Sequence, residues 1–406
     1  YIFPPSLREI PTRDKPTLFI FWEPQDKFWL DYMMSEGKFL HGEELTPLET
    51  MEDVLERFGD TVRECGIALW DTEVPSTHTA TTACGVDGYL PVRENSFALD
   101  LIKNKTGAEI KLDLTGKFTA EGKIWETDEE TTGSRKCDAY IWALNKYMKK
   151  TSDSIMFFTV DGASWVDDRW YYGDMGNAFV PNMDYAVVNR AFVFDLFCFD
   201  DEAPCDDKTQ PLGTDLRTMK RILRAQYDKN EGKKITTVCG FNPWHVKYTD
   251  IGEGVESEWR LGEILSSYNC VKDADAAGYC GLADASVYRH FPLKKHYTNR
   301  KPNPPKEGYD KNKTYILFYV GDYDAAAWTA RFIPRWYKDE NLGKLPLMWC
   351  FNPNLSDRIP RSTSSTKTIP KTTTLKRETR EPATTIRAFC TLRESSPTFP
   401  RALRQT

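Results

Sequence analysis

The sequence predicts an α/β protein with an N-terminal α/β domain and a TIM-barrel-like (β/α) C-terminal domain. Three observations support this fold class. In the first half, apolar strands alternate with amphipathic helices, which is typical of parallel sheets. In the second half, short apolar strands end in polar and aromatic residues, as strands do at the catalytic face of a (β/α) barrel. The 406 residues are 40% hydrophobic and 28% charged, which is ordinary for a chain that buries a core.

The first half supplies the alternation element by element. Helices are expected where apolar residues recur at helical spacing, and strands where short apolar runs are bounded by turn residues. The expected strands are 15–22, 66–71, 154–162 and 190–199, and the expected helices are 47–65, 138–150 and 216–229. The acidic, proline-containing loop at 200–215 marks a boundary, so we expect one domain at 1–210 and a second at 211–360.

Four segments of the second half share the strand-then-polar pattern. They are 234–250, 285–297, 313–328 and 345–354. Because the loops after the strands build the active site of a (β/α) barrel, these segments are where catalytic residues are expected. A doubly wound sheet follows the same logic and is the alternative architecture.

The strongest catalytic candidates follow the apolar run YILFYV, which we expect to be a buried strand. Asp322 and Asp324 flank Tyr323, and in an extended chain their side chains point to the same side. Two close carboxylates raise each other's pKa, which lets one of them donate a proton near neutral pH. The alternative is that Asp324 caps the following helix and Asp322 closes a turn.

A second candidate group lies in GFNPWHVKYTDIGEGVESEWR. Trp244 is suited to stack on a sugar ring, and Lys247 to bind hydroxyl or carboxylate groups. Glu256 and Glu258 can act as acid or base, since glycoside hydrolysis needs two carboxylates facing one glycosidic oxygen. Both glutamates equally suit the N-terminus of a helix, where negative charge is favourable.

Other residues are candidates for substrate binding. Trp328 and Trp349 can form sugar-stacking walls, with core packing as the alternative, and Asn352 follows the last expected strand. Asp275 belongs to a D-x-D pair that resembles part of a calcium loop. The glycine and terminal glutamate positions of an EF-hand are missing, so we expect Asp275 to line a cleft or cap a helix and assign no metal site.

Several function classes are disfavoured by composition and motifs. The net charge of −6 argues against a nucleic-acid partner, and no apolar run approaches the ~20 residues of a membrane span. The nucleophile elbow, the dinucleotide fingerprint and the P-loop are absent, and the ten cysteines lack zinc-ligand spacing. No cofactor is therefore expected.

Six blocks of the sequence, in order along the chain, resemble the GxGYxYP family of glycoside hydrolase-like proteins, which is named for a motif near its C-terminus. The blocks are GIALWDTEVPSTHTATTACGVDGYLPVR, QPLGTD, GFNPWHVKYTD, VESEWR, YILFYVGDYDAAAW and LPLMWCFNPNLSDR. The resemblance runs from the first expected strand to Pro360 and implies an α/β domain followed by a TIM-barrel-like domain. It also implies hydrolysis of glycosides, an activity assigned to the family by fold and motif. Many members carry D-G-D-N where this chain has residues 321–324. Asp322 fits an acidic position there, whereas Tyr323 and Asp324 depart from the pattern.

The signature motif itself is absent, and residues 361–406 turn abruptly to Thr, Ser, Lys, Arg and Pro. The genetic code suggests why. With permitted codons for residues 361–387, omitting the first two nucleotides gives FDFVYENDPEDDYFEAGDSGAGYYNP as one allowed reading. Residues 378–387 then yield DSGAGYYNP, a G-x-G-Y-x-x-P motif. We expect a frameshift after Pro360, a disordered non-native tail at 361–406 and a C-terminal domain that is incomplete.

The expected function is hydrolysis of a polysaccharide or glycan by an extracellular or cell-surface enzyme, impaired in the truncated form. Asp322 is the leading catalytic carboxylate, with Glu258 or Glu256 as its partner. One alternative is a non-catalytic carbohydrate-binding protein with the same aromatic cleft. Another is a metal-dependent hydrolase that uses Asp273, Asp275 and Asp322. The sequence indicates neither the linkage cleaved nor the oligomeric state.

Overall fold

A computed structural model describes most of the chain up to Trp349. The described residues are 17–21, 24–71, 77–158, 183–240, 257–274, 284–292, 310–316, 318–320, 326–342, 344 and 348–349. The chain divides into two compact units. Unit 1 comprises Tyr1–Trp22 and Glu44–Val287, and unit 2 comprises Glu23–Glu43 and Tyr288–Thr406.

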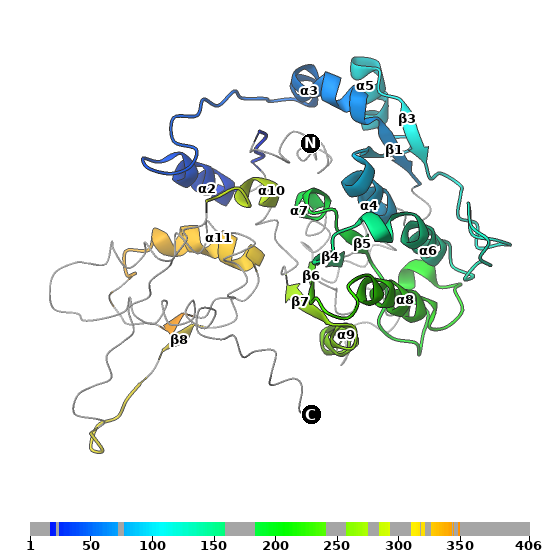
Figure 1. The fold of residues 1–406 in the computed structure, drawn as a ribbon. Coiled ribbons are helices and arrows are strands. Elements are labelled where there is room, and N and C mark those ends of the chain that lie inside the picture. The colour runs from blue at the N-terminus through cyan, green and yellow to red at the C-terminus, as the bar shows by residue number, and fades with distance from the viewer. Residues whose placement is uncertain are drawn as a thin grey trace. The chain divides into compact units, whose positions relative to one another are not determined.

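The N-terminal sheet of unit 1 has three parallel strands in the order β2-β1-β3. Its strands are β1 (Ile67–Trp70), β2 (Leu90–Arg93) and β3 (Ile110–Asp113), and the helices beside it are α3 (Met51–Cys65), α4 (Thr77–Asp87) and α5 (Phe97–Thr106). Helix α3 begins at a capping box, in which Thr50 and Asp53 bond each other's backbone N–H groups. Figure 1 shows α3 and α5 together at one end of the sheet.

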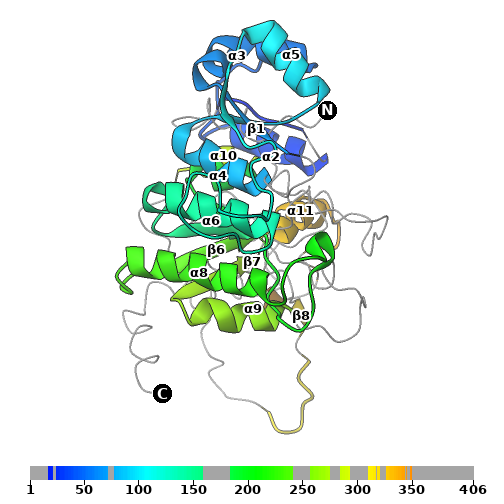
Figure 2. The same cartoon turned by 90° about the vertical axis from the view of Figure 1, so that its right-hand side faces the viewer.

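The second sheet of unit 1 has four parallel strands in the order β5-β4-β6-β7. Its strands are β4 (Ile155–Phe158), β5 (Phe192–Phe194), β6 (Thr236–Gly240) and β7 (Cys270–Ala274). The associated helices are α6 (Arg135–Tyr147), η1 (Met148–Lys150), α7 (Met183–Val188), η4 (Cys205–Asp207), α8 (Thr214–Lys229) and α9 (Ser257–Ser266). Helices α4, α6 and α8 lie side by side (Figure 2). The expected α/β class with parallel sheets is confirmed.

The core of unit 1 is centred on helix α6. This helix is buried on most of its circumference, with the charged residues Lys136 and Asp138 buried alongside its apolar side chains. Trp142 stacks on Trp125 with ring centroids 5.1 Å apart, and Phe158 stacks on Phe194 at 5.0 Å across the β4–β5 pair. The Phe158–Phe194 contact holds β4 and β5 together next to their carboxyl ends.

Two expectations about elements differ from the structure. Residues 17–21 form no strand, although Leu18 is buried. The segment beginning at Ala285 is the short helix α10 (Ala285–Tyr288), because the Asp184 carboxylate accepts the backbone N–H of Ser286 at 2.8 Å and starts a turn there. Strands β4 and β6, which lie on either side of residue 210 in the sequence, pair in the four-stranded sheet.

The described part of unit 2 is smaller. It contains α2 (Pro24–Met34), α11 (Ala326–Tyr337) and the parallel pair β8 (Tyr319–Val320) with β9 (Met348–Trp349). The indole N–H of Trp29 donates to the carbonyl of Ala330 at 2.7 Å, which joins α2 to α11. The expected buried strand YILFYV is shorter than predicted: only Tyr319–Val320 form β8, and Ile316 and Phe318 before it are exposed.

Gly240 is required where β6 ends. Its φ is +92°, and a Cβ there would lie 2.1 Å from the carbonyl oxygen of Phe158 on β4. We predict that Gly240→Ala destabilises the fold by about 2–4 kcal/mol, because strain and backbone overlap add. Gly262→Ala on α9 is the control. It meets nothing within 4 Å and should stabilise by roughly 0.5–1 kcal/mol. Equal denaturant midpoints for the two variants would contradict the prediction.

Candidate functional site

The carboxyl ends of β6 and β7 form one edge of the four-stranded sheet. Gly240 pairs with Ala274, so the chain leaves both strands at the same level. In parallel sheets, ligands bind outside this edge. Three of the expected substrate-binding residues follow these strands: Trp244 and Lys247 after β6, and Asp275 directly after β7. All three lie outside the described residues.

Helix α9 precedes β7 in the chain and begins at the same carboxyl edge of the sheet. Its ten residues are about 15 Å long, close to the roughly 16 Å length of the five-residue strand β7. The helix is therefore long enough to run back from the carboxyl edge to the amino edge, where β7 starts. Glu258 is the second residue of α9, and the structure does not describe its side chain; Glu256 lies just before the described helix. The position of Glu258 in the first turn of α9 also fits the alternative role, in which its negative charge stabilises the helix N-terminus.

The other expected residues belong to unit 2. Val320 pairs with Trp349, so β8 and β9 also end side by side. Asp322, Asp324 and Asn352 follow these strands and lie outside the described residues. Trp328 is in α11 and Trp349 in β9, with side chains that the structure does not describe.

Two buried aspartates are described at the carboxyl edge of the sheet in unit 1. Asp195 follows β5 directly and is fully buried, and its backbone N–H donates to the Tyr140 hydroxyl at 2.9 Å. Asp273 is the fourth residue of β7 and is also buried. Sequence reasoning missed Asp195, although a carboxylate directly after an apolar strand was an available signal. β5 and β7 are three strand spacings apart, so the backbones of Asp195 and Asp273 are separated by about 14 Å.

A buried ion cluster lies between the N-termini of α6 and α8. The ammonium group of Lys136 donates to Asp206 at 2.9 Å and to Asp215 at 2.7 Å, and all three side chains are almost completely buried. Both helix N-termini are at the carboxyl edge of the sheet, since α6 runs back toward the start of β4 and α8 follows β5.

Asp215 connects this cluster to the loop after β5. One carboxylate oxygen accepts the backbone N–H of Phe197 at 2.8 Å. The other accepts the Gln210 amide at 2.9 Å and the Cys137 thiol at 3.2 Å. Four donors converge on one carboxylate, which satisfies a charge that would otherwise be costly to bury. The cluster therefore fixes the backbone where β5 ends.

In this cluster Lys136 keeps its positive charge, and Cys137 is not available as a nucleophile. Burial alone lowers the pKa of Lys136, but the Asp206 and Asp215 carboxylates outweigh it and place that pKa well above its ordinary value. Burial, followed by the nearby Asp215 carboxylate, raises the pKa of the Cys137 thiol well above its usual range. Lys136 thus stays charged and Cys137 stays a thiol, so the arrangement is structural.

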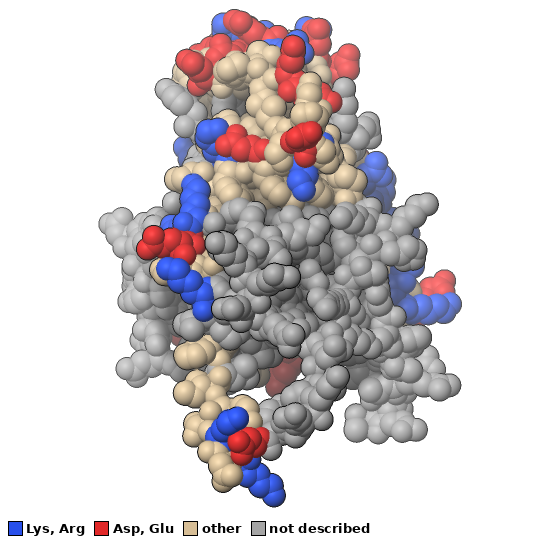
Figure 3. Space-filling model, turned by 90° about the vertical axis from the view of Figure 1, so that its left-hand side faces the viewer, with Lys and Arg blue, Asp and Glu red and all other residues tan. Residues whose placement is uncertain are grey.

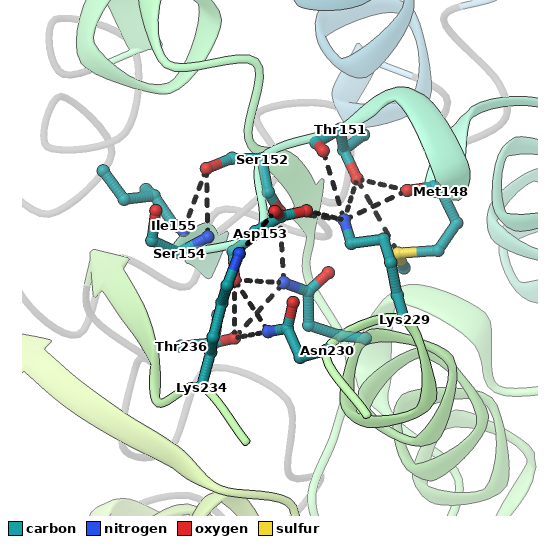
Figure 4. Close-up of polar contacts among 11 residues, drawn as sticks. Met148, Thr151, Ser152, Asp153, Ser154, Ile155, Lys229, Asn230, Lys234 and Thr236 are labelled. Carbon is teal, nitrogen blue, oxygen red and sulfur yellow. Dashed lines mark hydrogen bonds and ion pairs between the residues drawn. The ribbon is translucent and has the colours of Figure 1, made fainter. Parts of the chain in front are cut away.

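A second polar network lies at the opposite, amino edge of the sheet (Figure 4). Lys229 donates to the carbonyls of Met148, Thr151 and Ser152 at 2.9–3.1 Å, and Asn230 donates to Thr236 at the start of β6. Burial lowers the pKa of Lys229 to about 8, against the opposing pull of a nearby carboxylate. The carbonyls enclose its ammonium group, so this network joins the end of α8 to the end of η1 and to the strand starts.

The described residues contain neither a cluster of metal-ligating side chains nor a helix that could span a membrane. Within it, no three His, Cys, Asp or Glu side chains are grouped so that they could hold a metal ion. No helix there is both long enough and apolar enough to cross a membrane.

The C-terminal segment is similar to a known family domain. Residues 312–365 match the GxGYxYP putative glycoside hydrolase C-terminal domain. The family resemblance is confirmed. The GxGYxYP match contains β8, α11 and β9, together with the expected residues Asp322, Asp324, Trp328, Trp349 and Asn352. No curated protein matches the sequence.

The fold is similar to that of a solved structure. A crystal structure described as a putative hydrolase from Bacteroides thetaiotaomicron VPI-5482 aligns with a TM-score of 0.60 and 15% identity. The alignment covers 93% of this chain and 58% of that one, so this chain spans little more than half of that protein. At this identity the likeness concerns the fold alone. The GxGYxYP match is therefore the observation that bears on activity.

Proposed function

We propose that this protein is a glycoside hydrolase that acts on a polysaccharide or glycan. The observation that carries the proposal is the GxGYxYP match over residues 312–365, which includes Asp322 just after a strand of a parallel pair. Carboxylates after the ends of parallel strands are where (β/α) enzymes place their acids and bases. A TIM-barrel-like arrangement of the C-terminal domain is part of this proposal.

The proposed chemistry uses two carboxylates. Asp322 donates a proton to the leaving glycosidic oxygen, and Glu258 or Glu256 acts as base or nucleophile on the opposite face of the sugar ring. Asp324 is the reserve candidate for the acid. Sugar contacts are assigned to the remaining predicted residues: Trp244, Lys247, Asp275, Trp328, Trp349 and Asn352. An extracellular or cell-surface location suits a polymeric substrate of this kind.

The test compares two forms of the chain on a panel of plant, fungal and bacterial glycans. One is the printed chain, and the other is the frame-restored chain, whose residues after Pro360 are those that resequencing of the gene gives in the shifted frame. Release of reducing ends is measured. We expect hydrolysis of at least one glycan, faster for the frame-restored chain. Sedimentation with the polymer but no release would favour a carbohydrate-binding protein instead, and neither binding nor release would refute both.

A further inference from the structure

Three sequons of the form Asn-x-Ser/Thr occur in the chain, at Asn104, Asn312 and Asn354. Such a tripeptide is the acceptor for N-linked glycosylation in proteins that enter a secretory compartment. The tripeptide alone does not decide whether a glycan is attached, because the transferase must reach both the asparagine and the hydroxyl two residues later. The structure describes the first two sequons, and they differ in this respect. Asn354 lies outside the described residues.

The sequon of Asn312 lies in an exposed turn. Every residue from 310 to 316 is exposed. The turn is shaped by Asp310, whose carboxylate accepts the backbone N–H of Asn312 at 3.0 Å and whose carbonyl accepts that of Lys313 at 3.1 Å. Figure 3 shows this segment at the lower end of the view, where its basic and acidic side chains lie at the surface. A surface turn of this kind is where an acceptor asparagine is expected.

The two reactive groups of this sequon are available. Within the described part of the chain, no hydrogen bond or ion pair engages the side-chain amide of Asn312 or the hydroxyl of Thr314. The turn is held instead by the Asp310 carboxylate and by the Tyr315 hydroxyl, which accepts the backbone N–H of Asp310 at 2.8 Å. A glycan on Asn312 therefore breaks none of the contacts that shape the turn.

The sequon of Asn104 is exposed at its asparagine but closed at its hydroxyl. It lies in helix α5, which has a cap at each end and so forms from local contacts. Thr106 is only 5% exposed, and its hydroxyl donates to the carbonyl of Ile102 at 2.7 Å and accepts the backbone N–H of Ala108 at 3.2 Å. A transferase could reach this hydroxyl only by unwinding the end of α5.

We propose that Asn312 is an N-glycosylation site and that Asn104 is not. The side-chain nitrogen of Asn312 attacks the anomeric carbon of an oligosaccharide that is joined through a diphosphate to a lipid carrier. A nitrogen–carbon bond forms, and the amide nitrogen loses one proton. The carbon–oxygen bond to the diphosphate breaks, and its electron pair leaves with the lipid diphosphate. The Thr314 hydroxyl is the group of the sequon that the transferase recognises.

This site goes beyond glycoside hydrolysis and is independent of whether the protein hydrolyses glycans. It needs only the secretory route that the proposed extracellular location implies. The experiment therefore directs the full chain into that route, by means of an added leader peptide in a eukaryotic cell line.

The measurement treats the chain with an amidase that removes N-linked glycans and converts each glycosylated asparagine to aspartate. Peptide mass spectrometry then gives the occupancy of each sequon. We expect the occupancy of Asn312 to exceed that of Asn104 by at least about fivefold. Chain that stays inside the cell is analysed in the same way, because the glycan is transferred before export.

Three variants separate the roles of the two sequons. Asn312→Gln and Thr314→Ala should each remove the glycan, whereas Thr314→Ser should keep it, because serine supplies the same hydroxyl. Asn104→Gln is the matched control and should leave the glycan mass unchanged. All of these positions are exposed, so the variants should fold normally. An unmodified Asn312, a glycan that survives Thr314→Ala, or equal occupancy of Asn104 and Asn312 would overturn the proposal.

Discussion

Asp322→Asn in the frame-restored chain is expected to lower kcat on a natural glycan by about 10²–10⁴-fold, with KM nearly unchanged. This is the usual contribution of a general acid that protonates a leaving group. Asn is isosteric with Asp but cannot donate an acidic proton, so binding survives while the chemical step slows. Initial rates of reducing-end release over a range of substrate concentrations give both constants.

The leaving group distinguishes an acid from a nucleophile. An aryl glycoside with an acidic phenol leaves without protonation, so Asp322→Asn should slow its cleavage far less than that of the natural glycan. Glu258→Gln should slow both substrates alike. Glu263→Gln, an exposed position on the same helix α9, is the matched control and should retain full activity. Full activity of Asp322→Asn on both substrates would remove Asp322 from the mechanism.

Lys136→Met is expected to destabilise the protein by about 3–5 kcal/mol, because it leaves Asp206 and Asp215 buried without their cation. Domains are commonly stable by only about 5–15 kcal/mol, so the variant should be close to unfolding at 37 °C. Chemical denaturation followed by circular dichroism measures the difference. Lys146→Met, on the same helix but at an exposed ion pair, is the control and should cost less than about 1 kcal/mol.

The pH dependence of this difference follows from the raised pKa of Lys136. A lysine with a higher pKa in the folded state stabilises the fold fully below its unfolded pKa of about 10.4. That stabilisation is lost only as the pH rises through the folded-state pKa. The gap between the wild type and Lys136→Met should therefore stay constant from neutral pH to about pH 10 and narrow above it. A gap that closes near pH 8 would contradict the assignment.

Much of the fold could be predicted from local patterns. The expected helices at 47–65, 138–150 and 216–229 correspond to α3, α6 and α8, because their apolar spacing and caps act within a few residues. Parallel strands followed from the alternation of strands with these helices. The expected strand at 15–22 and the one starting at 285 were wrong, since short apolar runs do not distinguish a strand from a buried segment or a single helical turn.

The sequence predicted which residues belong to the candidate site, but not how their side chains are arranged in space. The sequence placed Trp244, Asp275 and Asp322 directly after apolar runs, and the strands β6, β7 and β8 end just before them. Which of these side chains face one another remains a prediction, because a distance between carboxylates depends on loops that bring remote segments together.

The sequence by itself indicated the α/β class and the resemblance to the GxGYxYP family, because these depend on short-range periodicity and on an ordered set of blocks. Only the tertiary structure revealed the Lys136 cluster, whose partners lie 70 and 79 residues away along the chain. It also showed that Ile316 and Phe318 are exposed, where the sequence predicts a buried strand. Burial and ion pairing are properties of what the rest of the chain brings alongside a residue, and no local pattern encodes that neighbour.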